Sequence, residues 1–287
     1  MDFTGNVIRF ETIDSTNRFL ASEALRGAPE GTVCVADYQT SGRGRAKRTW
    51  ESPPLGGLLA SVLFRPEIPM RQIHLIPAMT ALAILDASEK VSDVRCGIKW
   101  PNDIVYRDKK LGGMLSEMIN SANSDGGMHP VLVVGFGINC AWPKDFQIEE
   151  EKAIALPPTT LAEITGRSPD KNALLEAILR NIQTRYAQLV SSLVSDKVDG
   201  IKDSGGTVPE ESGHRTDTAF HTTAESITRE YRSRCVTLGK NIKVIFRDKT
   251  LYGRAMDIDE SGRLVVTTEG QTITVDAADI VHLRQSD

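Results

Sequence analysis

Apolar runs separated by glycines, prolines and polar turns fill the first two thirds of the chain. Runs of strand length predict strands at residues 7–10, 32–38, 58–64, 98–100, 104–106, 111–118 and 131–137. Apolar residues at helical spacing predict helices at residues 16–26, 73–85, 160–165 and 172–190. Short polar turns between several strands favour an α+β fold, with a mixed, largely antiparallel sheet flanked by helices.

The pattern changes after residue 194. Residues 195–226 are polar and contain a glycine pair, so we expect a mobile insertion or linker that buries too little apolar area to offset its ordering entropy. Short strand patterns then follow at 241–246, 250–256, 263–268 and 271–275, as in a small β-barrel. We therefore predict a first domain at 1–194 and a second domain at 227–287.

Composition narrows the class of protein. The 287 residues are 40% hydrophobic and carry a formal net charge of −4, which is typical of a globular protein and does not favour a nucleic-acid partner. We find no apolar run of about 18 residues and no leader pattern at the start, so we expect no membrane partner and a cytoplasmic location. The four cysteines are scattered without a CxxC pair, which predicts reduced structural thiols.

One segment departs from this mildly acidic background. Residues 41–50, SGRGRAKRTW, place four basic side chains among glycines and end on Trp50. A glycine-rich backbone can direct several N–H groups at one anion. Arginine adds paired N–H donors whose geometry fits phosphate or carboxylate. A solvated basic turn or a nucleic-acid contact remains an alternative for this segment taken alone. Trp50 can be a stacking surface for a purine or a core residue.

Three further polar motifs interrupt the apolar strands. Residues 99–103, KWPND, place a cation, an amide and a carboxylate in a turn, which is either a binding motif or an Asx turn. Lys110 precedes two glycines, where it either faces a ligand or extends to solvent from a strand end. Residues 135–139, GFGIN, lack the third glycine and the helix of a dinucleotide fingerprint, so we reject a Rossmann fold. The sequence also contains no P-loop, zinc-protease or nucleophile-elbow motif, which disfavours hydrolases.

Taken in order, residues 14–17, 39–45, 99–103, 110–115 and 135–139 resemble the blocks of the biotin protein ligases, the biotin–[acetyl-CoA-carboxylase] ligase family. The resemblance covers about residues 7 to 190, and residues 234–240 with the strands behind them look like the family's C-terminal SH3-like β-barrel. It implies the fold shared with class II aminoacyl-tRNA synthetases. It also implies a reaction in which biotin and Mg-ATP give biotinyl-5′-AMP, whose biotinyl group then passes to a lysine of a carrier domain.

The resemblance carries roles over to matching positions. It implies that biotin is bound by Ser15, Thr16, Asn17, Gln39, Gly42, Arg43, Gly44, Arg45, Lys110, Gly113, Gly135 and Gly137. It implies that the nucleotide is bound by Arg43, Arg45, Trp50, Asn102, Lys110 and Asn139. For catalysis we name Lys110, Arg45 and Asp103, with Asp103 as a ligand of Mg²⁺ or as the group that helps the acceptor lysine lose its proton.

The implied partners are biotin, ATP and the biotin carboxyl carrier domain of a carboxylase, and a homodimer is left open. Because the first block begins at residue 14, we expect no N-terminal helix-turn-helix and no DNA partner. Two alternatives stay open. A lipoate or octanoate ligase or transferase shares the fold, although Gln39 followed by GRGR favours biotin, and a nucleic-acid-binding protein is the remote alternative.

Overall fold

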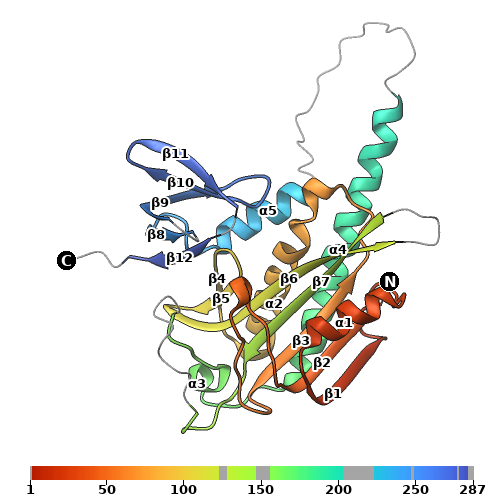
Figure 1. Cartoon of the computed structure of the whole chain (residues 1–287), viewed down its shortest axis with the longest axis vertical. Coiled ribbons are helices and arrows are strands. Elements are labelled where there is room, and N and C mark those ends of the chain that lie inside the picture. The colour runs from red at the N-terminus through yellow and green to blue at the C-terminus, as the bar shows by residue number, and fades with distance from the viewer. Residues whose placement is uncertain are drawn as a thin grey trace, which may run out of the picture.

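The chain folds around a seven-stranded sheet with the order β1-β2-β3-β7-β6-β5-β4 (Figure 1). The computed structural model describes residues 2–122, 128–146, 156–202, 223–246, 249–276 and 278–283. The strands are β1 (Val7–Ile13), β2 (Val33–Gln39), β3 (Gly57–Phe64), β4 (Gly97–Lys99), β5 (Asp103–Tyr106), β6 (Lys109–Ala122) and β7 (Met128–Asn139). β1 runs parallel to β2 and the other neighbours pair antiparallel, so the prediction of a mixed, largely antiparallel sheet is confirmed.

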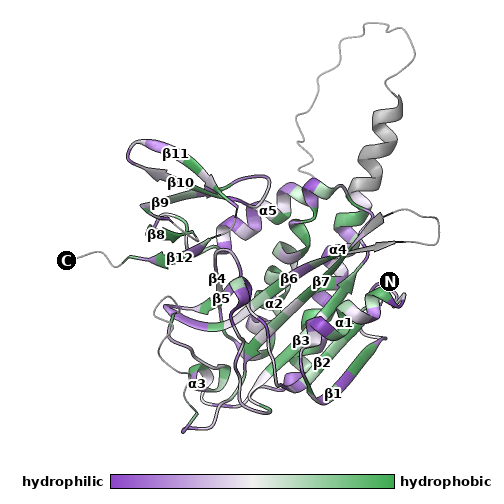
Figure 2. Cartoon of the chain, in the orientation of Figure 1, coloured by the Kyte–Doolittle hydropathy of each residue, from purple (hydrophilic) through white to green (hydrophobic). Residues whose placement is uncertain are grey.

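Helices cover both faces of this sheet. α2 (Leu75–Ser92) and α4 (Lys171–Lys202) lie against one face, and α1 (Thr16–Leu25) lies against β2, β3 and β7 on the other. Alternation along β7 separates the two sides, because Val134 belongs to the large core under α2 whereas Val133 packs with Leu20 of α1. Figure 2 shows β3, β7 and α2 as strongly hydrophobic, as burial on both faces requires.

The predicted linker at 195–226 differs from the structure at both ends. α4 continues to Lys202, so the polar composition after residue 194 does not mark the end of this helix. At the other end α5 (Thr223–Arg234) begins inside the predicted linker and packs on α2, with Ile227 buried in the main core. Residues 203–222 lie outside the described residues.

The remaining elements form a second sheet. β8 (Asn241–Ile245), β9 (Thr250–Ile258), β10 (Leu264–Thr268), β11 (Gln271–Val275) and β12 (Asp279–His282) pair antiparallel in the order β11-β10-β9-β8-β12. Trp100 joins this sheet to the first one, since its backbone N–H donates to Thr237 Oγ1 (3.0 Å) and its indole donates to Gly262 O (3.1 Å). Its side chain is therefore fixed between the two sheets.

The four cysteines are free and buried, as expected for structural thiols. Burial raises the pKa of Cys34 and of Cys96 to about 12 and that of Cys140 to about 11, so these groups stay protonated near neutrality. Within the described residues, no helix combines the length and apolar character needed to span a membrane.

Candidate active site

A cavity of about 1150 Å³ opens on the α1 side of the large sheet and is called the site cavity here. It receives residues from α1, the loop after β2, the β4–β5 turn, β6, β7 and the segment before α3 (Leu161–Thr165). Of the residues named from the sequence, those that line it are Ser15, Thr16, Asn17, Gln39, Arg43, Gly44, Arg45, Trp50, Asn102, Asp103, Lys110, Gly113, Gly135, Gly137 and Asn139. Gly42 instead lies against the Trp50 backbone, where an added Cβ would meet Trp50 O at 2.4 Å.

Thr16, Asn17 and Gln39 line one end of the cavity, and the buried Ser61 side chain contacts Thr16 and Asn17; we call these four side chains the polar end. The Ser15 side chain caps α1 by accepting from the Arg18 N–H (3.4 Å), which fixes the start of the helix. Both the backbone N–H and the hydroxyl of Thr16 donate to Gln39 Oε1, at 2.8 and 3.1 Å. Ser61 Oγ lies 2.7 Å from Thr16 Oγ1 and 2.6 Å from Asn17 Oδ1. This end is uncharged and densely hydrogen-bonded.

Glycines of β6 and β7 form a flat wall beneath Trp50. An added Cβ on Gly137 would lie 2.6 Å from Trp50 Cε2, and one on Gly113 would lie 3.2 Å from Trp50 Cζ3. The indole therefore needs glycine at these positions. Trp50 Nε1 is buried and meets no acceptor among the residues that the structure describes, so this donor is available to a ligand.

The basic loop, residues 41–50, folds back on itself beside the cavity. The Trp50 N–H donates to Gly42 O (3.0 Å) and the Gly44 N–H donates to Arg48 O (2.7 Å), while Ala46 and Lys47 adopt positive φ angles of 52° and 62°. This backbone directs the arginines to different partners. Arg43 Nη1 lies 2.8 Å from Glu117 Oε1, and Arg48 pairs with Asp279 of β12. The charge of the loop is thus partly neutralised by acids of the same chain.

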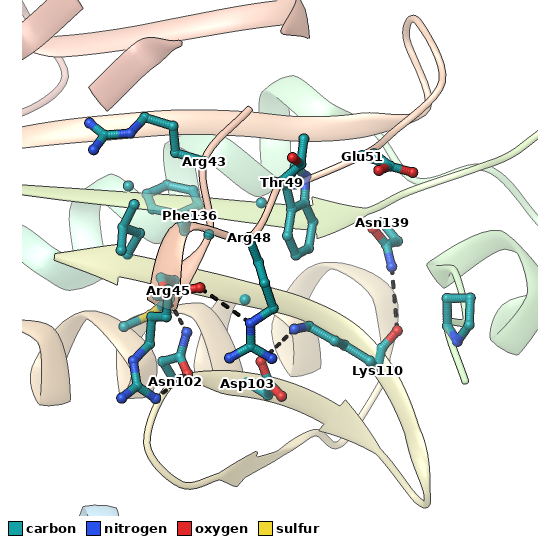
Figure 3. Close-up of a pocket in the computed structure, with 18 of the residues that line it drawn as sticks. Arg43, Arg45, Arg48, Thr49, Glu51, Asn102, Asp103, Lys110, Phe136 and Asn139 are labelled. Atoms are coloured by element: carbon teal, nitrogen blue, oxygen red, sulfur yellow. Dashed lines mark hydrogen bonds and ion pairs between the residues drawn. The ribbon is translucent and has the colours of Figure 1, made fainter. Parts of the chain in front are cut away.

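Lys99, Asp103 and Lys110 form a cluster that we call the cationic centre. Lys110 Nζ lies 2.6 Å from Asp103 Oδ1, and Lys99 Nζ lies 4.0 Å from Asp103 Oδ2 (Figure 3). Burial lowers the pKa of Lys99, Asp103 raises it and Lys110 lowers it. The Lys110 ammonium also lies 5.6 Å from the centroid of the Trp50 ring, in cation–π range. Two lysines thus share one carboxylate, which leaves positive charge for an anion.

Arg45 extends the positive charge from the basic loop toward this centre. Its Nη1 donates to Asn102 Oδ1 at 3.3 Å, and Asn102 Nδ2 donates to Met114 O at 2.6 Å, so the KWPND turn supports the guanidinium. Burial lowers the pKa of Arg45, the Asp279 charge opposes this shift and nearby Arg48 adds to it. Figure 3 shows Arg45 and Lys110 on the same side of the site, with Arg43 directed away from them.

Asn139 has a structural contact that its sequence position does not reveal. Its Nδ2 donates to Thr159 O (3.0 Å) and to Lys110 O (3.3 Å), so both amide hydrogens are engaged. The backbone of Lys110 is also held by Pro157, because the Lys110 N–H donates to Pro157 O at 2.8 Å. Asn139 therefore ties β7 to the strand that carries Lys110.

Several lining residues escaped the sequence reasoning. They are Thr49, Glu51, Trp142, Phe146, Leu156, Pro157, Pro158, Thr159, Glu163 and residues 278–280. Trp142 packs edge-to-face with Phe146 at 5.2 Å between ring centroids, and these two aromatic residues soon after the glycine-rich strand were the available signal. Glu117 lies beside the cavity on the same face of the sheet, and it was missed because a single acidic residue in a strand is typical of a solvent-facing position.

A resident metal ion does not fit this site. Within the described ranges, no three histidine, cysteine, aspartate or glutamate side chains gather closely enough to hold one. Asp103 already has ammonium groups at both carboxylate oxygens, which opposes a divalent cation there. Proteins commonly bind Mg²⁺ through substrate phosphates and one or two carboxylates. The suggested Mg²⁺ ligation by Asp103 therefore finds no support in the geometry.

Comparisons with known proteins agree with the fold. Residues 9–139 match the biotin/lipoate A/B protein ligase family, and residues 237–283 match the biotin protein ligase C-terminal domain. The chain is 30% identical to the bifunctional ligase/repressor BirA of Bacillus spizizenii over 96% of this chain and 73% of that protein. It is 29% identical to the biotin–[acetyl-CoA-carboxylase] ligase of Mycobacterium tuberculosis over 94% of this chain and 86% of that protein.

A solved structure resembles this chain over its whole fold. The biotin protein ligase of Aquifex aeolicus in complex with biotin and ATP superposes with a TM-score of 0.71 at 25% identity, covering 98% of this chain and 100% of that one. The match extends through both sheets and therefore includes every segment that lines the site cavity. The chain belongs to the biotin protein ligase family.

Proposed function

We propose that this chain activates biotin with ATP to biotinyl-5′-AMP and then transfers the biotinyl group to a lysine of a biotin carboxyl carrier domain. One observation carries the proposal: a single cavity joins an uncharged, hydrogen-bonding end to a cluster of cations brought from separate segments. The polar end suits a neutral ureido ring. The cations suit a carboxylate that becomes a mixed anhydride with phosphate.

The first step needs positive charge around the reacting phosphate. A carboxylate oxygen of biotin bonds to the α-phosphorus of ATP, the bond from that phosphorus to the bridging oxygen breaks, and pyrophosphate leaves. Lys110 and Arg45 would stabilise the charge that develops on the phosphate oxygens. Lys110 is suited to this role because its ammonium is held beside the glycine wall by Asp103 and by the Trp50 ring. Mg²⁺ would enter as part of the Mg-ATP substrate.

The second step needs an amine without its proton. The acceptor nitrogen bonds to the acyl carbon, the bond from that carbon to the AMP oxygen breaks, and the nitrogen loses a proton. The pKa of a free lysine is about 10.4, so a nearby group that accepts the proton assists the transfer. Asp103 can take this role once Lys110 turns to the phosphate and leaves Asp103 Oδ1.

The polar end favours biotin over a lipoyl or octanoyl acid. The hydroxyl and backbone N–H of Thr16 both donate to Gln39 Oε1. The amide N–H₂ of Gln39, which lines the cavity, can therefore donate to a ligand. An aliphatic acid would cover such polar groups without pairing with them, at a cost of about 1–3 kcal/mol for each group that it removes from water. Competition between biotin and octanoate in calorimetry measures this preference directly.

The finer description of the C-terminal region is also a proposal. The five strands β8–β12 support an SH3-like barrel, since a register shift between Val265 and Val266 bends β10 against β9 as closure requires. We propose a catalytic domain and a C-terminal domain that divide within the predicted linker at 195–226, although α4 and α5 both extend into that linker and the two sheets share one continuous core.

The experiment that tests the function is transfer to a carrier domain. The chain is incubated with biotin, Mg-ATP and a purified biotin carrier domain, and streptavidin blotting with mass spectrometry follows the modification. We expect one biotinyl group on the carrier lysine and none when ATP is omitted. An unmodified carrier, alongside a control ligase that modifies it, would refute the proposal.

A further inference from the structure

Glu117 contacts the polar end from the same face of the sheet, without lining the site cavity itself. It lies on β6 opposite Val133 of β7, on the same face of the sheet as the glycine wall. Glu117 Oε2 accepts from Asn17 Nδ2 at 2.9 Å and from Arg43 Nη1 at 3.0 Å. A carboxylate of the sheet thus contacts both a buried amide of α1 and an arginine of the basic loop.

These contacts determine the orientation of the Asn17 amide. Asn17 Nδ2 also donates to Leu115 O at 3.2 Å, and a carbonyl oxygen and a carboxylate can only accept hydrogen bonds. Exchanging the nitrogen and oxygen of this amide would place Oδ1 against two acceptors. Asn17 Oδ1 is therefore directed at Ser61 Oγ, 2.6 Å away, and Gly135 leaves the room for it because an added Cβ there would lie 1.9 Å from this oxygen.

A chain of hydrogen bonds links the orientation of the Asn17 amide to the residues that line the site cavity. Asn17 Oδ1 has no proton to give, so Ser61 is the donor in that pair. Ser61 Oγ can therefore only accept in its 2.7 Å contact with Thr16 Oγ1, and the single Thr16 hydroxyl proton is shared between Ser61 Oγ and Gln39 Oε1, which lies 3.1 Å away. The directions of these bonds decide which groups of Thr16 and Gln39 are left to meet a ligand.

We propose that Glu117 is a positioning residue for biotin: by orienting Asn17, it sets the donors and acceptors that Thr16 and Gln39 present to the ureido ring. This inference rests on the proposed function, because it names the ligand of the polar end. Glu117 acts through Asn17 and Ser61 and does not itself line the cavity wall. The chain of bonds through Asn17 and Ser61 leads to Thr16 and Gln39, so we predict a change in biotin binding and not in ATP binding.

Paired substitutions separate orientation from charge and from volume. Glu117→Met keeps the volume and removes the acceptor, whereas Glu117→Gln keeps an oxygen that can accept from Asn17 and removes the charge. We expect Glu117→Met to weaken biotin binding about tenfold, as for loss of a satisfied buried polar group, and Glu117→Gln to remain within about twofold of the unchanged chain. The KM for ATP stays unchanged in both. Glu176→Gln, at an exposed acid on α4 paired with Arg180, is the charge-matched control.

Ser61→Ala interrupts the same chain one bond nearer the ligand and keeps the test valid if Glu117→Met does not fold. We expect it to weaken biotin binding as Glu117→Met does, and the double variant to lose no more than either single one. Three results would overturn the inference: unchanged biotin binding in Glu117→Met and Ser61→Ala, equal loss in Glu117→Gln and Glu117→Met, or a parallel rise in the KM for ATP. If the unchanged chain does not bind biotin, the proposed function fails and this inference fails with it.

Discussion

Replacing Lys110 by alanine tests the role of the cationic centre in forming the acyl-phosphate. The substitution removes an ammonium that lies 2.6 Å from Asp103 Oδ1 and 5.6 Å from the Trp50 ring. Lys99 remains 4.0 Å from the same carboxylate, so Asp103 does not become an isolated buried charge. We therefore expect the free energy of unfolding to fall by only about 1 kcal/mol.

The expected loss of rate is larger. Opposite unit charges 4 Å apart gain about 1 kcal/mol in water and about 4 kcal/mol at an effective dielectric near 20. The Lys110 side chain is 26% exposed, which places the site toward the second value. A loss of about 2–4 kcal/mol of transition-state stabilisation corresponds to a rate lower by about 30-fold to about 1000-fold.

Biotin-dependent exchange of labelled pyrophosphate into ATP measures this rate without any acceptor. The matched control is Lys109→Ala, one residue earlier, because Lys109 is 48% exposed and pairs on the surface with Glu163. That pair contributes less than about 1 kcal/mol to stability, and we expect the exchange rate to stay unchanged. Exchange by Lys110→Ala at the same rate as Lys109→Ala would refute the assigned role of Lys110.

Three further substitutions give separate tests. Gly137→Ala places a Cβ 2.6 Å from Trp50 Cε2, so displacement of the indole should cost about 1–3 kcal/mol and raise the KM for ATP in steady-state assays; an unchanged KM would contradict the nucleotide role of Trp50. Asp279→Asn removes the partner of Arg48, and we expect faster proteolysis within residues 41–50 with less than about 1 kcal/mol lost in stability; equal cleavage would show that β12 does not restrain the basic loop. Burial, together with the Lys240 and Lys99 charges, lowers the pKa of His282 to about 4, so between about pH 6.5 and pH 4 the unfolded chain binds a proton that the folded chain does not bind. Stability should fall by about 1 kcal/mol from pH 7 to pH 5 in urea titrations, after allowance for screening by solvent, and His282→Gln should abolish this part of the loss; a fall of the same size in the variant would assign it to other groups.

Much of the large sheet could be predicted from local sequence. The run at 58–64 is continuously apolar because β3 is buried on both faces, and Ser15 marks the start of α1 because its hydroxyl caps the helix. The ends of α4 and the existence of α5 were missed. A surface helix among charged residues gains its stability from packing on α2, which local composition does not show.

The candidate site was predictable to the extent that its residues stand in recognisable blocks. Lys110, Asp103 and Arg45 come from separate segments, and only the sheet order places them around one cavity. The ion-pair partners of the basic loop could not be predicted from the sequence, since Asp279 lies 231 residues from Arg48. Glu117 likewise gains its contacts from Arg43, 74 residues away.

The central claim is that one cavity brings biotin and ATP together and retains their mixed anhydride. The direct test incubates the chain with biotin and Mg-ATP without acceptor, then analyses the protein by native mass spectrometry while released pyrophosphate is counted. We predict that each molecule retains one species with the mass of biotinyl-5′-AMP and releases one pyrophosphate. Recovery of unreacted biotin and ATP, with no pyrophosphate formed, would contradict the account.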